Sequence, residues 1–245
     1  MGHLQLIKLR ATKSTNDYLK KKALKTKNLN DCVVWALNQT KGKGQGNKSW
    51  LSTSGNSLTF SIYKEFGSIV ISQHFIINVM ASLAICETLN TFGIEKTKIK
   101  WSNDIMADNC KISGLLIENL IESSRKIGSI IGVGINVNNR QPYDGIKMTS
   151  MQMVTGKSFD LSSVLHRFLE CFNHYCTHYR KDRIDSILEE FSHRLWSRSN
   201  LKTLIVEGKS IRGKLCRLNA DGHLLIECIN HQKLLVPHHQ VKVIP

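Results

Sequence analysis

The sequence lacks several patterns that mark common protein classes. No apolar run approaches the roughly 18 residues of a membrane-spanning helix, and the first ten residues alternate instead of forming the apolar block of a secretory signal. Neither the P-loop pattern nor the G-x-G-x-x-G dinucleotide fingerprint occurs. We also find no internal repeat and no low-complexity tract. These absences argue against a membrane protein, a secreted protein and two common nucleotide-binding folds.

Cysteine pairs and acidic residues are also scarce. The seven cysteines form an odd set without a C-x-x-C pair, which favours reduced thiols in the cytoplasm over disulfides or a zinc site. Lys and Arg number 34 against 19 Asp and Glu, so the formal net charge is +15. Net charge concerns partners more than fold. Nucleic acid, polyphosphate, an acidic protein and simple solvated lysines all fit this excess.

A chain of 245 residues with 41% apolar content is long enough for one large domain and a small one. Alternating segments that follow one another through short turns predict a largely antiparallel sheet in an α+β fold. The predicted strands cover 4–10, 31–37, 57–62, the hairpin around Asp108-Asn109 and 127–138, with an irregular stretch at 140–155. The predicted helices cover 18–25, 72–92, 161–179 and 184–196.

The character of the chain changes after residue 200. Short β runs at 203–207, 210–218, 223–228 and 232–236 predict a small barrel or sandwich, so we divide the chain into domains at 1–200 and 201–245. This β segment contains no Phe, Tyr or Trp that could stack on a base. A docking or closure role is therefore favoured over nucleic-acid binding.

The segment Q-T-K-G-K-G-Q-G-N-K-S-W (39–50) contains three glycines at alternate positions. Glycines at this density disfavour a helix or strand interior but allow backbone N–H groups to approach an anion. The flanking lysines add positive charge, and Trp50 adds a ring for stacking. A mobile surface loop with solvated charges is the alternative interpretation.

Polar residues also interrupt the later strands. Asn103 and Asp104 lie before the predicted turn, and Lys111 lies just beyond it. Asp104 and Lys111 form either a simple cross-strand ion pair or a functional site, in which the Asp faces a phosphate or metal beside the lysine ammonium. Asn136 stands within the apolar, glycine-containing strand G-V-G-I-N-V-N. The pair His174 and His178 lacks a partnering carboxylate pattern, so surface histidines are favoured over a metal site.

Four ordered blocks resemble the biotin protein ligases, also called biotin–[acetyl-CoA-carboxylase] ligases. Ser14-Thr15-Asn16 resembles the family's S-T-N, and Gln39 with G-K-G-Q-G-N-K-S-W (42–50) resembles its G-R-G-R-x-G-R-x-W loop. The segments K-W-S-N-D (100–104) and K-I-S-G-L-L-I-E (111–118) are similar to K-W-P-N-D and K-x-x-G-I-L-x-E. G-V-G-I-N-V-N (132–138) is similar to G-x-G-I-N-V-N. Together with the small C-terminal domain, the blocks extend over nearly the whole chain.

The resemblance implies a catalytic domain like that of class II aminoacyl-tRNA synthetases followed by an SH3-like domain. It implies that biotin and ATP form biotinyl-5′-AMP, and that a lysine of a biotin carboxyl carrier protein of a biotin-dependent carboxylase then receives the biotinyl group. ATP with Mg²⁺ serves as substrate and activator, without a tightly bound prosthetic group. Because the S-T-N block comes so early, the chain resembles the ligases that lack a DNA-binding domain, so DNA is not an expected partner.

The resemblance also implies residue roles. Lys111 and Lys43 are the expected catalytic cations, and Lys111 touches both the biotin carboxylate and the α-phosphate. The expected biotin contacts are Ser14, Thr15, Asn16, Gln39, Gly42, Lys43, Gly44, Gln45, Lys111 and Gly114. The expected nucleotide contacts are Trp50, Asn103, Asp104, Lys111 and Asn136, with Asp104 also holding Mg²⁺. For Asn136 a purely structural hydrogen bond is an equal alternative.

Some positions depart from the family pattern. Lys43 and Gln45 stand where the family has arginines, so one bidentate group becomes a point charge and the other becomes neutral. Ser102 replaces the usual proline. Two other functions are alternatives: a lipoate ligase or octanoyl transferase of the same fold, whose R-R-x-x-G-G-G-x-V segment is missing here, and a basic nucleic-acid-binding module, which the charge favours.

Overall fold

The protein is described by a computed structural model, which covers residues 4–26, 29, 31–46, 48–66, 74–122, 125–143, 145–179, 184–196, 198 and 200–244. The chain divides into two compact units: residues 1–69 with 110–166, and residues 70–109 with 167–245. Each unit is described by itself. Within the described residues no helix is both long and apolar enough to cross a membrane.

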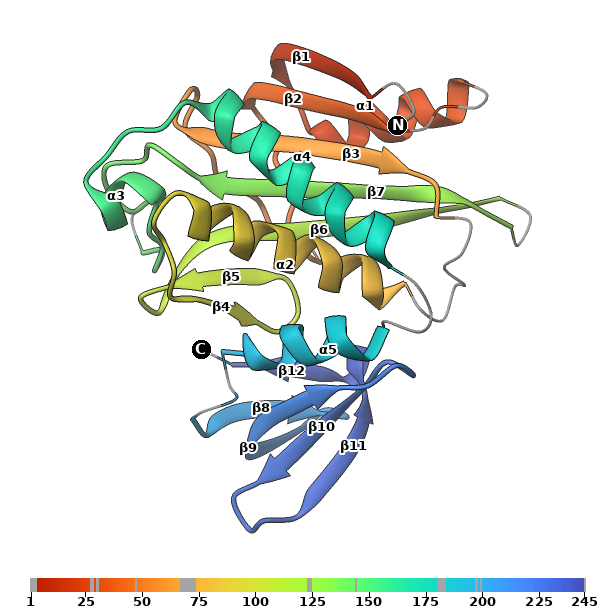
Figure 1. Cartoon of the computed structure of the whole chain (residues 1–245), viewed down its shortest axis with the longest axis vertical. Helices are drawn as coiled ribbons and strands as arrows, with labels where there is room; N and C mark the ends of the chain where they lie inside the picture. The colour runs from red at the N-terminus through yellow and green to blue at the C-terminus, as the bar shows by residue number, and fades with distance from the viewer. Residues whose placement is uncertain are drawn as a thin grey trace. The chain divides into compact units, whose positions relative to one another are not determined.

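The first unit contains five strands of one sheet, whose course can be followed in Figure 1. Hydrogen-bonded neighbours follow the order β1-β2-β3-β7-β6. These strands are β1 (Gln5–Thr12), β2 (Cys32–Gln39), β3 (Ser57–Lys64), β7 (Arg125–Asn136) and β6 (Cys110–Glu122). Only the β1–β2 pair is parallel among them, and the helix α1 (Thr15–Lys25) provides the crossover that a parallel pair needs. The prediction of a largely antiparallel sheet is confirmed.

Helix α1 covers part of one face of this sheet. Ser14 caps the helix by accepting a hydrogen bond from the backbone N–H of Asp17 at 3.4 Å. The helix packs through Leu19, which is fully buried, against Tyr63 of β3 and Ile130 of β7. The sequence predicted a start at Tyr18, but the helix begins three residues earlier, so that the S-T-N block forms its cap and first turn.

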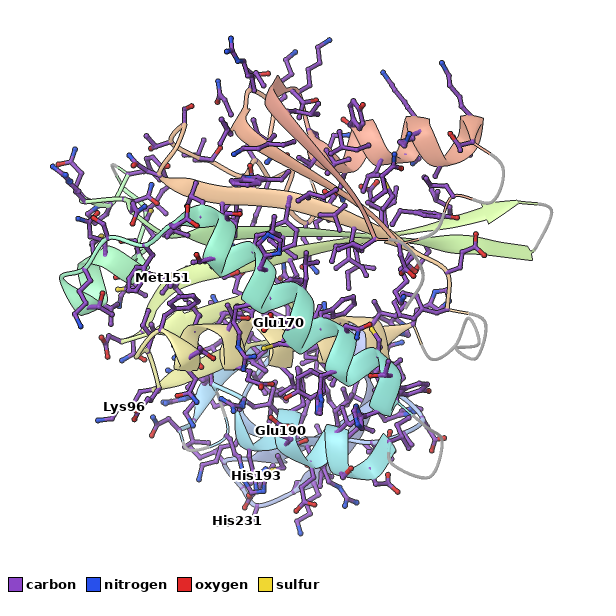
Figure 2. All side chains as sticks on the ribbon, turned by 45° about the horizontal axis from the view of Figure 1, so that its top comes forward. Lys96, Met151, Glu170, Glu190, His193 and His231 are labelled. Atoms are coloured by element: carbon purple, nitrogen blue, oxygen red, sulfur yellow. The ribbon has the colours of Figure 1, made fainter. Side chains whose placement is uncertain are left out.

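The segment after β7 is tied down by asparagines. Asn138 both donates to the carbonyl of Phe159 and accepts from its backbone N–H, at 2.8 Å and 2.9 Å. Asn139 accepts a hydrogen bond from Ser57. The stretch 140–155 was predicted to be irregular; it contains the short helix α3 (Met151–Thr155), whose buried first residue is labelled in Figure 2.

In the second unit, α2 (Phe75–Thr91) is buried on nearly every side, and it precedes the antiparallel pair β4 (Thr97–Lys100) and β5 (Asp104–Ala107). The sequence predicted that Asn103 and Asp104 interrupt one strand of the hairpin, but the chain turns at 101–103, so Asn103 lies in a turn between two strands. The predicted turn at Asp108-Asn109 is confirmed, with positive φ at both residues. Residues 72 and 73, where the predicted helix began, lie outside the described residues.

Two further helices pack in this unit. Arg167 of α4 (Leu161–His178) bonds to Thr91 and pairs with Glu87 on α2. The hydroxyl of Tyr175 donates to Glu190 of α5 (Ile184–His193) at 3.0 Å. Glu190 and His193 of α5 are labelled in Figure 2. Burial, with the nearby Glu190 carboxylate, raises the pKa of Tyr175 above its ordinary value.

The C-terminal residues form a five-stranded antiparallel sheet in the order β11-β10-β9-β8-β12 (blue in Figure 1). Its strands are β8 (Lys202–Val206), β9 (Lys209–Leu218), β10 (His223–Cys228), β11 (Lys233–Pro237) and β12 (Val241–Val243). The small β architecture is therefore confirmed, although β12 was not predicted. The Trp101 indole N–H donates to the carbonyl of His238 at 3.2 Å.

Candidate active site

The candidate site lies on the same sheet face as α1, in the part that the helix leaves uncovered. Residues two apart along a strand share a face, so Gly132 and Gly134 continue the face on which Ile130 packs against α1. Gly114 of β6 lies directly opposite Gly134. Glycines in a strand interior indicate close approach of another group. Here Gly114, Gly132 and Gly134 form a flat surface, which we call the floor, and other side chains lie directly on it.

Asn16 lies on this floor at Gly132. A Cβ atom on Gly132 would be only 2.3 Å from Asn16 Oδ1, so this position requires glycine. The Asn16 amide accepts a hydrogen bond from Ser61 Oγ at 2.6 Å and donates to Glu118 Oε2 at 2.8 Å and to the carbonyl of Leu116 at 3.3 Å. Strands β3 and β6 and the first turn of α1 are thereby joined through one amide, and Asn16 is only 4% exposed.

Thr15 and Gln39 lie next to Asn16, and we call these three residues the polar wall. The backbone N–H of Thr15 donates to Gln39 Oε1 at 2.8 Å, and the Thr15 hydroxyl lies 3.0 Å from the same oxygen. Ser61 Oγ is 2.6 Å from Thr15 Oγ1 as well. These contacts occupy the side-chain carbonyl oxygen of Gln39. The Nε2 atom of Gln39 faces Gly42, and a Cβ atom added to Gly42 would lie 3.2 Å from it. Hydroxyl and amide groups therefore collect at the end of the floor beside the α1 N-terminus.

The glycine-rich segment forms a narrow ribbon, defined as residues 41–46 and 48–50. Its two sides pair through Gly44 N–H to the Lys48 carbonyl at 2.7 Å and Trp50 N–H to the Gly42 carbonyl at 3.0 Å. The base is held by the Lys41 N–H, which donates to the carbonyl of Lys13. Residue 47 lies outside the described residues.

Trp50 places its ring on the glycine floor. A Cβ atom on Gly134 would be 2.3 Å from Trp50 Cε2, and one on Gly114 would be 3.2 Å from Trp50 Cζ3. Lys111 lies beside the same ring, with Nζ 5.4 Å from its centroid and 3.1 Å from the Gly114 Cβ position. The two glycines thus clear room for an indole and an ammonium group.

The backbone of Lys111 is fixed by the segment that follows β7. Its N–H donates to the carbonyl of Lys147 at 3.3 Å, and its carbonyl accepts from the N–H of Thr149 at 2.9 Å. Asn136 Nδ2 donates to the carbonyl of Thr149 at 3.0 Å and lies 3.5 Å from that of Lys111. This is the structural alternative foreseen for Asn136; its nucleotide contact stays a prediction.

A cavity of about 900 Å³ opens between the ribbon and β6. Tyr143 contributes to its wall, and the hydroxyl of Tyr143 contacts Thr53 Oγ1 at 2.9 Å. Leu116 and Glu118 contribute from β6. The remaining lining residues are Gln39, Thr40, Lys41, Gly42, Lys43, Gly44, Gly46, Lys48, Ser49, Trp50, Leu51 and Ser52. Such a cavity is large enough for a small organic ligand.

The ribbon carries an ion pair to α1. Lys43 Nζ lies 2.6 Å from Asp17 Oδ1, and this hydrogen bond is the largest cause of the raised pKa of Lys43. Glu118 adds further attraction for the same ammonium. Lys20 of α1 lies 3.9 Å from Glu118 on its other side. We call Asp17, Lys20, Lys43 and Glu118 the charge cluster.

Most of the predicted site residues therefore lie in the first unit. Those that line the cavity are Gln39, Gly42, Lys43, Gly44 and Trp50. Those outside its lining are Ser14, Thr15, Asn16, Gln45, Lys111, Gly114 and Asn136, which are connected to it through the contacts given above. Asn103 and Asp104 belong to the second unit, at the turn and start of β5, and their role stays a prediction. Among the described residues no group of three or more His, Cys, Asp or Glu could hold a metal ion.

Several neighbours of the cavity were not predicted. Ser61 and Glu118 complete the contacts of Asn16, and Tyr143 lines the wall. Glu118 had a usable signal, because it is four residues from Gly114 on a strand and so shares its face. Ser61 lies in a strand without any sequence feature that separates it from an ordinary buried serine.

Comparison with known proteins identifies the class. The sequence profile of the biotin/lipoate A/B protein ligase family matches residues 9–136, more than half of the chain. The chain belongs to this family. It is 30% identical over 201 residues to the bifunctional ligase/repressor BirA of Bacillus subtilis, a match that covers 80% of this chain and 61% of BirA. The chain thus spans about three fifths of the length of this relative.

The resemblance within the family is to the biotin protein ligases. The biotin protein ligase of Aquifex aeolicus in complex with biotin and ATP superposes with a TM-score of 0.81, at 24% identity and 99% coverage of both chains. A mutant of that ligase in complex with biotin gives a TM-score of 0.78 at 26% identity, with 98% of both chains covered. The α+β fold with a small C-terminal β-sheet is confirmed by these likenesses.

Proposed function

We propose that this protein is an ATP-dependent biotin protein ligase. One observation carries the proposal: a flat glycine floor joins a polar end wall, built around Thr15, Gln39 and Asn16, to an ammonium and an indole at Lys111 and Trp50. Biotin has a polar ureido ring at one end and a carboxylate at the other. The amides and hydroxyls of the wall suit the ring, and the ammonium suits the carboxylate.

The first step joins biotin to AMP. A carboxylate oxygen of biotin attacks the α-phosphorus of ATP, the bond to the bridging oxygen breaks, and pyrophosphate leaves. Both reactants are anions, so a fixed cation at the point of attack lowers the barrier. Lys111 is assigned this role, because its backbone is held on both sides by Lys147 and Thr149. Mg²⁺ commonly binds through one or two carboxylates and substrate phosphates, and Asp104 is the assigned carboxylate.

The second step transfers the biotinyl group. The neutral amine of a carrier lysine attacks the acyl carbon of biotinyl-5′-AMP, an amide forms, and AMP leaves. Until then the mixed anhydride must be shielded from water. The ribbon lies along the cavity and is assigned this shielding, with Lys43, Gly44 and Gln45 against the adenylate. The carrier is a biotin carboxyl carrier protein, whose encounter the net charge of +15 favours if that carrier is acidic.

We assign the catalytic steps to residues 1–200 and a docking or closure role to residues 201–245, where the chain folds as a separate antiparallel sheet. None of the seven cysteines, all of which are described residues, forms a disulfide, which supports a reducing compartment such as the cytoplasm. The alternative of a lipoate ligase or octanoyl transferase fits less well, because an apolar acyl tail would leave the polar wall without partners.

The decisive experiment is biotin-dependent exchange of labelled pyrophosphate into ATP, with octanoate and lipoate as competing acids. We expect exchange with biotin and none with either competitor. Lys111→Ala should lower exchange by roughly 100-fold or more, the effect of removing one fixed charge-stabilising group, while circular dichroism stays unchanged. No exchange with any acid, together with salt-dependent DNA or RNA binding, would replace this proposal by the nucleic-acid alternative.

A further inference from the structure

The charge cluster lies where the ribbon meets the body of the first unit. Lys43 comes from the paired part of the ribbon, since it forms an antiparallel bridge with Ser49. Asp17 comes from the first turn of α1, immediately after the S-T-N block. Glu118 comes from β6 and lines the cavity. The cluster therefore links the ribbon to two elements that the fold itself holds in place.

The contacts inside the cluster are directional. Lys43 donates to Asp17 at 2.6 Å, and Asn16 donates to Glu118 at 2.8 Å, so each carboxylate has a fixed hydrogen-bond partner. Asp17 is further favoured by its position in the first turn of a helix, where a negative charge meets the positive end of the helix dipole. A carboxylate fixed in this way is a suitable anchor for a lysine on a glycine-rich segment.

The sequence explains why an anchor is needed here. The ribbon contains Gly42, Gly44 and Gly46, and Gly46 has a φ of +63°, so its backbone has many conformations available when it is not held. Lysine is a point charge on a flexible stem and lacks the planar fork of arginine. An ion pair can restrict such a side chain where geometry alone does not.

We propose that Asp17 is a positioning residue that, with Glu118 behind it, holds the ribbon across the cavity by binding Lys43. Asp17 does not itself line the cavity, so it acts on the ligand only through Lys43. The consequence for the activated acyl group rests on the proposed ligase function: a ribbon held closed retains the acyl-adenylate. The geometric statement itself is independent of that function and can be tested without it.

The first test measures ribbon opening in the protein without ligand. Trypsin cleavage of the bond after Lys48 is followed by mass spectrometry for the wild type and for Asp17→Asn, which keeps an acceptor oxygen and removes the charge. A half-exposed ion pair of this kind predicts a rise in cleavage rate between about 1.5-fold and 5-fold. The difference should shrink as the salt concentration rises to about 1 M, where the screening length is only about 3 Å. Equal rates at low salt would overturn the proposal.

The second test separates Asp17 from a general effect on α1. Asp17→Asn is combined with Lys43→Met, and cleavage after Lys48 is measured in all four combinations. If Asp17 acts through Lys43, Asp17→Asn changes nothing further in the Lys43→Met background. Undiminished acceleration there would mean that the substitution loosens the helix itself, and the proposal would fail.

A third measurement connects the anchor to chemistry. With biotin and ATP, Asp17→Asn should release biotinyl-5′-AMP about 1.5-fold to 5-fold faster, while Lys20→Met, which leaves the Lys43 contact in place, should not. If the wild type forms no biotinyl-5′-AMP, the ligase function fails while the cleavage results still decide the anchor. If the adenylate forms and its release is unchanged, the anchor has no role in retention and that part of the proposal is wrong.

Discussion

Replacing Gly132 with alanine tests the geometry of the floor most directly. The new Cβ atom would lie 2.3 Å from Asn16 Oδ1 and 3.0 Å from its Cγ, so the Asn16 side chain has to move. That movement breaks its contacts to Ser61 at 2.6 Å and to Glu118 at 2.8 Å. We therefore expect Gly132→Ala to destabilise the first unit and to distort the polar wall.

The magnitude follows from three effects. Overpacking a tight interior costs about 1–3 kcal/mol, and each lost hydrogen bond costs about 1 kcal/mol more. Alanine also restricts the unfolded chain, which stabilises by about 0.4–1 kcal/mol. The losses exceed this gain, so the free energy of unfolding should fall by roughly 2–4 kcal/mol. For a chain of this size each kcal/mol corresponds to about 2–4 °C in Tm.

Urea unfolding followed by circular dichroism measures this change, and Asn16→Ala supplies the matched background. Without the Asn16 amide the added methyl group has space, so Gly132→Ala should then cost less than about 1 kcal/mol. A loss of similar size in both backgrounds would refute the reasoning, because the cause would then lie in the strand backbone and not in the contact with Asn16.

Three further predictions concern other parts of the structure. Gly134→Ala should displace Trp50 from the floor and weaken ATP binding roughly tenfold by calorimetry; unchanged affinity for ATP would mean that Trp50 does not contact the nucleotide. Thr15→Val leaves Gln39 without its hydroxyl contact, so we expect biotin to bind about 5-fold to 100-fold more weakly. An unaltered dissociation constant for biotin would mean that Thr15 is not part of the biotin site. Burial lowers the pKa of His238 from 6.5 to about 4. The unfolded chain therefore binds more protons between these values, so stability should fall as the pH drops from 6.5 to 4, and His238→Gln should flatten that dependence in thermal melts.

Much of the fold could be predicted because its signals are local. Helical spacing located α2, and alternation with turn residues located the strands of the C-terminal sheet. Errors came where the local signal was ambiguous. Asn103 looked like a polar residue inside one strand, but the chain reverses there, and the three-residue strand β12 is too short to give a pattern.

The residues around the cavity were predicted by resemblance, while their contacts were not. Nothing local in the sequence indicates that Asn16 lies on Gly132, because the two are brought together by the packing of α1 on β7. The ion pair between Asp17 and Lys43 is hidden for the same reason. Asp17 and Lys43 have ordinary polar side chains at ordinary positions in the sequence. Only the β1–α1–β2 crossover brings these two residues together.

The shared sheet face has a practical consequence for protein engineering. The glycine floor and the apolar layer under α1 belong to the same strands, and the Asn16 amide lies at their border. Variants designed to accept a bulkier acid will therefore change thermal resistance at the same time as selectivity. A library built on these positions should be sorted for folded protein before it is scored for new substrates.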